Sequence, residues 1–254
     1  MEHLKFPKIP EIVLYQDEYV LALNKPAGMP SLKDRNSPEQ MDLLAHTRRL
    51  YSGAQLCHRL DRATSGVILA ALSPEAYRTI TLQFQERKVE KHYYTLISGR
   101  HLFKDVQVEA PISVQRNGLV RIDAINGKEA TTVFNSVEYF NDYTLLCCKP
   151  ITGRQHQIRV HLAYLQCPIV GDRDYGGSDI FLSKLKKRYH LDRNLEKEPP
   201  VNHHFLLHAG SITFKHPIKQ ETITCQAPYP KHFEAVLKVL RKYNYLPPTH
   251  HPGS

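Results

Sequence analysis

Long apolar runs are missing from this sequence. No segment approaches about 18 consecutive apolar residues, the least that a membrane-spanning helix needs. The N-terminal stretch MEHLKFPKIPEIVLY also lacks the apolar core of a secretory signal peptide. The sequence therefore predicts a protein without a membrane span, working in the cytoplasm.

Cysteine and histidine spacings typical of metal sites are missing as well. The five cysteines form no CxxC pair, and their odd number favours reduced, partly buried thiols. The fifteen histidines include no HExxH spacing, and the adjacent His203 and His204 would point to opposite faces of a strand. The sequence contains no phosphate-binding loop and no dinucleotide-binding motif. We therefore expect no metal and no cofactor.

What the sequence does have is the size and composition of an ordinary globular protein. Its 254 residues, 41% of them hydrophobic, can bury roughly 70–75% of the surface of the unfolded chain. We predict one domain over residues 1–254, with a core over about 12–243 and a disordered, Pro-rich tail over 247–254. The net charge of +9 suits a polyanionic partner, although many basic proteins bind no nucleic acid.

The hydrophobic pattern predicts both strands and helices. The expected strands cover residues 12–15, 19–24, 67–72, 91–97 and several short segments between 106 and 149. The expected helices cover residues 37–51, a segment that begins at 73–75, a segment capped by Thr152, and a closing segment around 233–240. Closely spaced strands of this kind favour an α+β fold with a large, mixed, mostly antiparallel sheet and flanking helices.

The most informative stretch is HRLDRATSG, residues 58–66, which precedes the expected buried strand 67–72. It places the carboxylate of Asp61 between Arg59 and Arg62, and opposite charges favour the ionised acid. An ionised Asp fixed at the edge of a sheet can act as a nucleophile. An Arg–Asp pair that only pins a surface loop explains the same residues equally well.

This stretch resembles the signature loop of the RluA-type pseudouridine synthases, in which the Asp is the catalytic residue. Three further blocks match that family in the correct order, among them KHYYTLISG at residues 91–99 and TGRQHQIRVH at 152–161. The resemblance extends from about Val13 to about Leu240 and implies the pseudouridine synthase fold with a central catalytic cleft. It also implies a catalytic domain without the accessory N-terminal RNA-binding domain of many relatives.

The resemblance implies an isomerase that converts uridine in RNA to pseudouridine without net redox or hydrolysis. Asp61 would attack either the anomeric carbon of the ribose or the uracil ring, and the sequence leaves both routes open. Arg154 would pair with Asp61 and hold it ionised. Tyr93 would stack on the base and could assist proton removal, although a strand Tyr is otherwise more often a core residue. Arg59 would occupy the space that the flipped base leaves.

Other candidates come from the same blocks. The expected substrate-binding residues are Arg59, His58, Arg62, Thr64, Lys91, Gln155 and His156. Arg159 and His161 either support the site or lie at the surface. Lys25, in the turn KPAG, matches a family lysine with a largely structural role, and a plain turn explains it equally well.

The partner that the resemblance implies is RNA, either transfer RNA or large-subunit ribosomal RNA, bound by a monomer. A basic stretch over residues 184–193 is either a solvated helix or a contact to the RNA backbone. The alternative function is that of a non-catalytic RNA-binding protein with the same fold.

Overall fold

The computed structural model describes residues 6–33, 41–116, 118–192, 194–202 and 204–245. The predicted disordered tail, His203 and part of the expected helix over 37–51 lie outside these residues. Within them, no helix is both long and apolar enough to cross a membrane.

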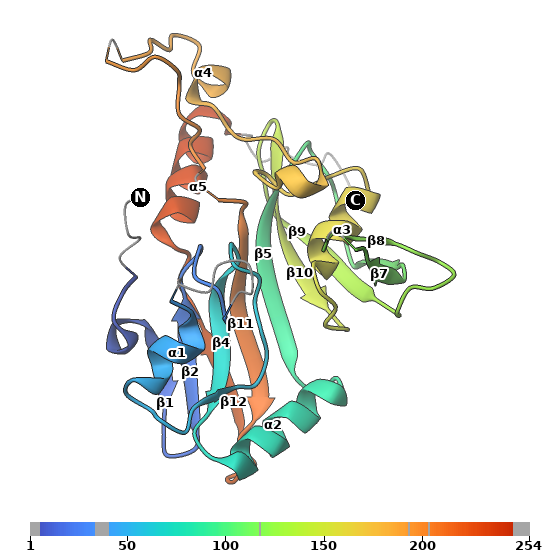
Figure 1. The fold of residues 1–254 in the computed structure, drawn as a ribbon. Helices are drawn as coiled ribbons and strands as arrows, with labels where there is room; N and C mark the ends of the chain where they lie inside the picture. The colour runs from blue at the N-terminus through green and yellow to red at the C-terminus, as the bar shows by residue number, and fades with distance from the viewer. Residues whose placement is uncertain (1–5, 34–40, 117, 193, 203, 246–254) are drawn as a thin grey trace, which may run out of the picture.

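One mixed sheet forms the centre of the molecule (Figure 1). Among the described residues it contains ten strands: β1 (Val13–Gln16), β2 (Val20–Lys25), β3 (Gln55–Leu56), β4 (Ser65–Ala71), β5 (Glu90–Ser98), β6 (Val106–Glu109), β9 (Thr131–Tyr139), β10 (Tyr143–Pro150), β11 (Leu207–Lys215) and β12 (Thr222–Gln226). The main order is β1-β2-β4-β11-β5-β10-β9-β6, with β3 paired to β4 and β12 to β11. Of the described strand pairs, only β4 and β11 run parallel, so the predicted mixed, mostly antiparallel sheet is confirmed.

Two further strands, β7 (Ile112–Val114) and β8 (Val120–Ile122), form a separate antiparallel hairpin. Figure 1 shows this hairpin beside the helix α3 (Gln157–Tyr164), at the β9–β10 end of the sheet. Buried Ile112, Val120 and Ala130 pack there with Val160 of α3. The hairpin is therefore fixed to the body of the protein by an apolar cluster of its own.

The other helices are α1 (Leu43–Arg48), α2 (Pro74–Gln85), α4 (Leu182–Leu185) and α5 (Lys231–Tyr243), and short 3₁₀ turns cover Ile9–Ile12 and Arg173–Tyr175. Both the second expected helix and the closing one are confirmed. Ser73 caps α2 by accepting a hydrogen bond from the backbone N–H of Ala76 at 3.2 Å, as its Ser-Pro start predicts. In α5 the buried face carries Phe233, Val236, Leu237 and Leu240.

The strand that follows the signature loop is buried over its whole length. Val67 and Leu69 pack with α2 on one face of the sheet, while Ile68 and Ala70 pack with Ile9 and Leu43 on the other. Near the start of this strand, a Cβ on Gly66 would lie 2.1 Å from the backbone oxygen of Ala209. The absence of a side chain at Gly66 thus lets β11 lie directly against the end of the signature loop.

The expected cap at Thr152 is wrong. The helix α3 begins at Gln157, and His156 before it has left-handed backbone angles, φ 53° and ψ 17°. The side chain of Gln157 instead holds the preceding turn: its Oε1 accepts from the Thr152 hydroxyl at 2.6 Å and from the Arg154 backbone N–H at 3.0 Å. Its Nε2 donates to the backbone oxygen of Thr131 at 2.9 Å.

The basic stretch after α4 forms no long helix. The helix itself has four residues, and a turn-rich segment follows it, which Figure 1 shows projecting beyond the sheet near one end of α5. Lys184, Lys186, Lys187 and Arg188 are exposed. Contact with the RNA backbone therefore stays a prediction for this stretch. The five cysteines are free and buried or half-buried, as expected.

Candidate active site

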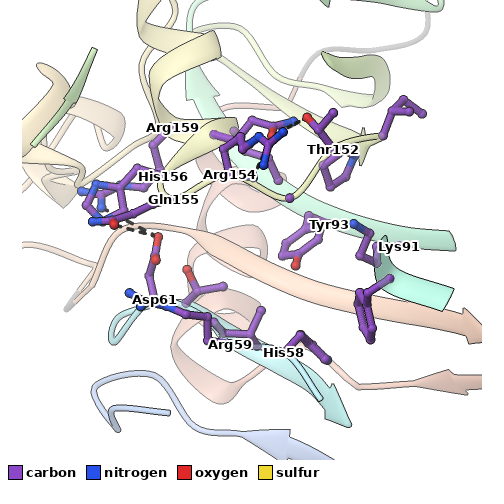
Figure 2. A pocket seen from close by; sticks show the side chains of 18 of the residues that line it. His58, Arg59, Asp61, Lys91, Tyr93, Thr152, Arg154, Gln155, His156 and Arg159 are labelled. Atoms are coloured by element: carbon purple, nitrogen blue, oxygen red, sulfur yellow. Dashed lines mark hydrogen bonds and ion pairs between the residues drawn. The ribbon is translucent and has the colours of Figure 1, made fainter. Parts of the chain in front are cut away.

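A cleft of about 540 Å³ opens between the signature loop, the first half of β5 and the turn before α3. Figure 2 shows Asp61 on one side of it, Tyr93 and Lys91 at the other end, and His156 and Arg159 facing Asp61. Its volume lies within the range of small-molecule and cofactor pockets. Three separate parts of the chain therefore meet around a space large enough for a nucleoside.

Asp61 lies in the loop before β4, and its side chain is 21% exposed. Its Oδ2 is 3.8 Å from Nε2 of His156 and 3.9 Å from Nη1 of Arg159. The loop is held on both sides: Ser31 exchanges two hydrogen bonds with Leu60, at 2.7 and 3.0 Å. The backbone N–H of Thr64 donates to the backbone oxygen of Asp61 at 3.1 Å.

Lys25 connects the turn KPAG, in which it lies, to the signature loop. Its fully buried ammonium donates to the backbone oxygens of Pro26, Met29 and Arg62, at 3.0, 2.8 and 3.1 Å. Burial lowers the pKa of Lys25 to about 7, and the charge of Asp61 acts in the opposite direction. The plain turn suggested by the sequence is thus a support for the loop that carries Asp61.

Arg159 is the buried cation of the site, with 3% of its surface exposed. Its guanidinium bonds Asp172 through Nε and Nη2, at 2.6 and 2.7 Å, and Asp174 through Nη2 at 2.8 Å. The rings of Tyr175 and Phe205 lie 4.7 and 4.5 Å from its central carbon. Burial alone would lower the pKa of Arg159, but the neighbouring carboxylates raise it, so the group stays charged.

The expected pairing of Arg154 with Asp61 is wrong. Arg154 lines the same cleft but is exposed, and its Nε donates to the backbone oxygen of Glu129 at 3.0 Å. The guanidinium within 4 Å of Asp61 is that of Arg159. Since α3 begins at Gln157, Arg159 lies in its first turn and Arg154 lies in the turn outside it. Asp172 and Asp174, which bond Arg159, are the residues that could have indicated a buried arginine in the sequence.

Tyr93 and Lys91 come from one face of β5, as their spacing predicted, and both line the cleft. Burial raises the pKa of the Tyr93 hydroxyl, and the charge of Asp61 raises it further. Tyr93 therefore stays protonated and can stack or donate a hydrogen bond, but it does not supply a phenolate base at neutral pH. Burial lowers the pKa of Lys91 to about 8, and its ammonium lies 6.0 Å from the Phe84 ring.

His58 is a structural member of the cleft wall. Its Nε2 accepts a hydrogen bond from the backbone N–H of Leu69 at 3.0 Å, and its ring packs 4.7 Å from that of Phe84. Burial, with the charge of Lys91, lowers the pKa of His58 to about 3, so the ring is neutral. Its hydrogen bond therefore ties the signature loop to β4.

Of the remaining predicted residues, Arg59 and Thr64 line the cleft and Arg62 does not. Arg59 is exposed at the cleft, and Thr64 is buried in its wall. Among the described residues, the Thr64 hydroxyl has no hydrogen-bond partner. Arg62 instead donates through Nε to the backbone oxygen of Gly28 at 3.2 Å and supports the neighbouring loop.

His156 joins the cleft to the β7–β8 hairpin. Its Nδ1 lies 2.7 Å from the Tyr175 hydroxyl, which accepts a hydrogen bond from the backbone N–H of Val120 at 3.0 Å. The hydroxyl proton is then available for Nδ1, and this assigns the ring proton to Nε2, facing Asp61. Burial lowers the pKa of His156, with the charge of Asp61 opposing it. Gln155 donates to the backbone oxygen of Gly118 at 3.4 Å, also toward the hairpin.

His161 also lies in the interior, so of the two positions that the sequence left open for it, the surface position is wrong. It is fully buried, with Nδ1 3.0 Å from the Thr132 hydroxyl and Nε2 3.1 Å from the backbone oxygen of Ala110. Within the described part of the chain, no group of three or more His, Cys, Asp or Glu side chains is arranged to hold a metal ion. The groups that line the cleft include a carboxylate, a phenol, imidazoles and cations.

Comparison with known proteins identifies relatives over most of the chain. Residues 19–164 match the family model of RNA pseudouridylate synthase. The chain is 35% identical to "Ribosomal large subunit pseudouridine synthase C" of Vibrio parahaemolyticus, over 94% of this chain and 72% of that protein. It is 34% identical to "Dual-specificity RNA pseudouridine synthase RluA" of Escherichia coli K12, over 90% of this chain and 98% of that protein.

Solved structures give the same result for the fold. "Human RNA Pseudouridylate Synthase Domain Containing 4" superposes with a TM-score of 0.70 and 25% identity, covering 92% of this chain and 94% of that one. "Human RNA Pseudouridylate Synthase Domain Containing 1" gives a TM-score of 0.64 at 25% identity, covering 86% and 83%.

Proposed function

The chain belongs to the RNA pseudouridylate synthase family, as an isomerase that converts uridine in RNA to pseudouridine, and we propose that its targets are particular uridines of transfer RNA, of large-subunit ribosomal RNA, or of both. The names of the two relatives, one acting on the ribosomal large subunit and one of dual specificity, support this range. The observation that carries the assignment is the carboxylate of Asp61 in the cleft, facing His156 and Arg159.

The reaction exchanges one bond between base and sugar for another. The bond from uracil N1 to C1′ of the ribose breaks, a bond from C5 to C1′ forms, C5 loses a proton and N1 gains one. Asp61 acts as the nucleophile at C1′ or at the uracil ring, and each route begins from the carboxylate. In this proposal Arg159, rather than Arg154, orients the Asp61 carboxylate and offsets its charge, because its own position is fixed by Asp172.

The rest of the cleft receives the flipped base. Removing a base from its stack costs a few kcal/mol. The Tyr93 ring stacks on the uracil, and Thr64 forms part of the wall beside it. The exposed guanidinium of Arg59, which is planar and stacks well, takes the place of the uridine in the RNA. We propose that the protein acts as a monomer in the cytoplasm.

The test is the substitution Asp61→Asn, assayed by release of tritium from RNA labelled at C5 of uracil. We expect a loss of rate on the order of a thousandfold or more, as for other residues that act directly on the reacting atoms. The matched control is Asp105→Asn, an exposed residue just before β6 and outside the cleft. Tritium release at the wild-type rate from the Asp61→Asn protein would contradict the role of Asp61. No tritium release from the wild-type protein would instead identify a protein that binds RNA without this chemistry.

A further inference from the structure

A second hollow, of about 350 Å³, adjoins the active-site cleft. Gly153, Arg154 and Gln155 line both hollows and form a common wall. Gly153 adds no side chain to that wall, and the space beside it is open: a Cβ there would have Lys91 Nζ as its nearest contact, at 4.0 Å. A strand of RNA with one nucleotide in the cleft therefore passes directly over this wall to reach the second hollow.

The second hollow has the surface chemistry of a nucleobase site. Ile112 and Val120 form its apolar floor, with 4% and 3% of their surfaces exposed, and both belong to the cluster that fixes the hairpin to α3. Val114, paired with Val120 across the hairpin, lies beside them but is 58% exposed. An exposed aliphatic side chain at the edge of a hollow offers apolar surface against which the face of a planar base can pack.

The rim of the hollow supplies hydrogen-bonding groups and positive charge. Asn126 and Gln155 carry amides, which can both donate to and accept from a base edge. Lys128 and Arg154 are exposed cations on the same rim, and cations of this kind contact phosphates. A free phosphate would contact only the cations and amides, whereas a nucleotide can also pack its base on the apolar floor.

We propose that this hollow holds the base of the nucleotide that directly adjoins the target uridine in the RNA strand. The inference rests on the proposed function only in placing the uridine in the cleft beside Asp61. It makes the β7–β8 hairpin a determinant of which uridine is modified, because the neighbouring base must leave the RNA stack and enter this second site. Arg154, which stands between the two hollows, then contacts the RNA rather than Asp61.

An abasic scan tests the proposal without altering the protein fold. The probes are stem-loop RNAs from transfer RNA and large-subunit ribosomal RNA, of which the tightest binder to the Asp61→Asn protein is used. Each loop nucleotide is made abasic in turn, and the Kd is measured by fluorescence anisotropy. We expect two adjacent sensitive positions: the uridine, which weakens binding about tenfold as for a lost base–aromatic contact, and one neighbour, which weakens it by about fivefold to tenfold through lost apolar burial.

A cavity-filling variant identifies which position enters the hollow. Val114→Trp, made in the Asp61→Asn background, fills the hollow from an exposed strand position that tolerates aromatic residues. It should weaken binding of the intact RNA and abolish the abasic effect at the neighbour, but not at the uridine. Val137→Trp on β9, 52% exposed and outside both hollows, should retain both effects.

Two results overturn the proposal: a scan in which only one position is sensitive, or a neighbour effect that persists unchanged in Val114→Trp. Tritium release by the wild-type protein from the same intact RNA is measured separately. Release without a neighbour effect leaves the enzymatic function standing and removes the second site. A neighbour effect that Val114→Trp abolishes, without tritium release, supports the second site and contradicts the chemistry.

Discussion

Nδ1 of His156 lies 2.7 Å from the hydroxyl of Tyr175, while Nε2 of the same ring lies 3.8 Å from Asp61. The hydroxyl also accepts from the backbone N–H of Val120 in β8. His156 holds this position with left-handed backbone angles, which for a residue other than Gly cost about 1 kcal/mol or more. A continuous series of contacts thus leads from the hairpin to the Asp61 carboxylate.

Replacing Tyr175 with Phe should interrupt this series while keeping the ring that packs 4.7 Å from Arg159. The hydroxyl now donates to Nδ1 and so favours neutral His156. Its loss should raise the pKa of His156 from its lowered value, and the acid limb of the activity profile should move to higher pH. We expect kcat to fall about tenfold and KM to change little. Tyr164→Phe, 57% exposed on α3, serves as control; an unshifted pH profile in Tyr175→Phe would contradict the coupling.

Replacing Arg154 or Arg159, both in the block over residues 152–161, should change different kinetic parameters. Arg159→Lys removes a bidentate contact to Asp172 and the stacked guanidinium, so we expect kcat to fall about a hundredfold or more. The protein should also lose about 2 kcal/mol of unfolding free energy, because a Lys ammonium cannot replace the bidentate contact to buried Asp172. Arg154→Ala should mainly raise KM, since Arg154 is exposed and does not pair with Asp61. Steady-state kinetics and urea unfolding measure these effects, and an equal loss of kcat in both variants would contradict the assignment.

The sheet and the signature loop could be predicted from the sequence because the patterns that indicate them lie within short segments. The run over 67–72 is apolar throughout and is buried on both faces, and the alternation over 91–97 is that of a strand. Tyr93 and Lys91 share a face of β5 for the same reason, so the sequence placed both in the cleft. The parallel pairing of β4 with β11 joins segments more than a hundred residues apart, and no local pattern indicates it.

The partner of Asp61 could not be predicted because it depends on where α3 begins. Thr152 is a good capping residue by type, but its hydroxyl is engaged by Gln157, whose amide is held by the backbone of β9. This contact between distant parts of the chain moves the helix start by several residues. As a result Arg159, and not Arg154, lies at the Asp61 carboxylate, although both belong to the same block, residues 152–161.

The loss of stability on acidification should depend in part on Asp17, which lies outside the cleft. Burial would raise the pKa of Asp17, but hydrogen bonds from Tyr19, Tyr15 and Val20, together with His216, lower it to about 2. A lowered carboxyl pKa contributes stability above its ordinary value near 3.8, and this is lost as pH falls through about 2. Asp17→Asn should therefore cost about 2 kcal/mol at pH 7.

Urea unfolding at several pH values measures this contribution. The difference between wild type and Asp17→Asn should shrink as pH falls below about 4, because the wild-type carboxyl becomes protonated. The exposed Asp192→Asn, whose carboxylate accepts from the backbone N–H of Asn194, is the control and should change stability by less than about 0.5 kcal/mol. A difference for Asp17→Asn that stays constant down to pH 2 would contradict the role of its charge.

Thr64 allows function and stability to be separated at one position. Its side chain is buried, with 2% of the residue exposed, and lines the cleft three residues after Asp61. Its hydroxyl has no partner within the described residues, and leaving such a group unpaired costs about 1–3 kcal/mol. Thr64→Val should therefore leave the unfolding free energy unchanged or raise it by about 1 kcal/mol. If the hydroxyl bonds the substrate, kcat/KM should fall about tenfold.

The matched control is Thr144→Val, a buried threonine whose hydroxyl is fully engaged. It donates to the backbone oxygen of Gly99 at 2.8 Å and accepts from the backbone N–H of His101 at 3.0 Å. Removing it leaves both groups without a partner, so this variant should lose about 1–3 kcal/mol of stability and keep its kcat/KM under native conditions. Chemical denaturation and tritium release distinguish the two variants. If Thr64→Val lost stability like Thr144→Val and kept its activity, the Thr64 hydroxyl would serve the fold and not the uridine.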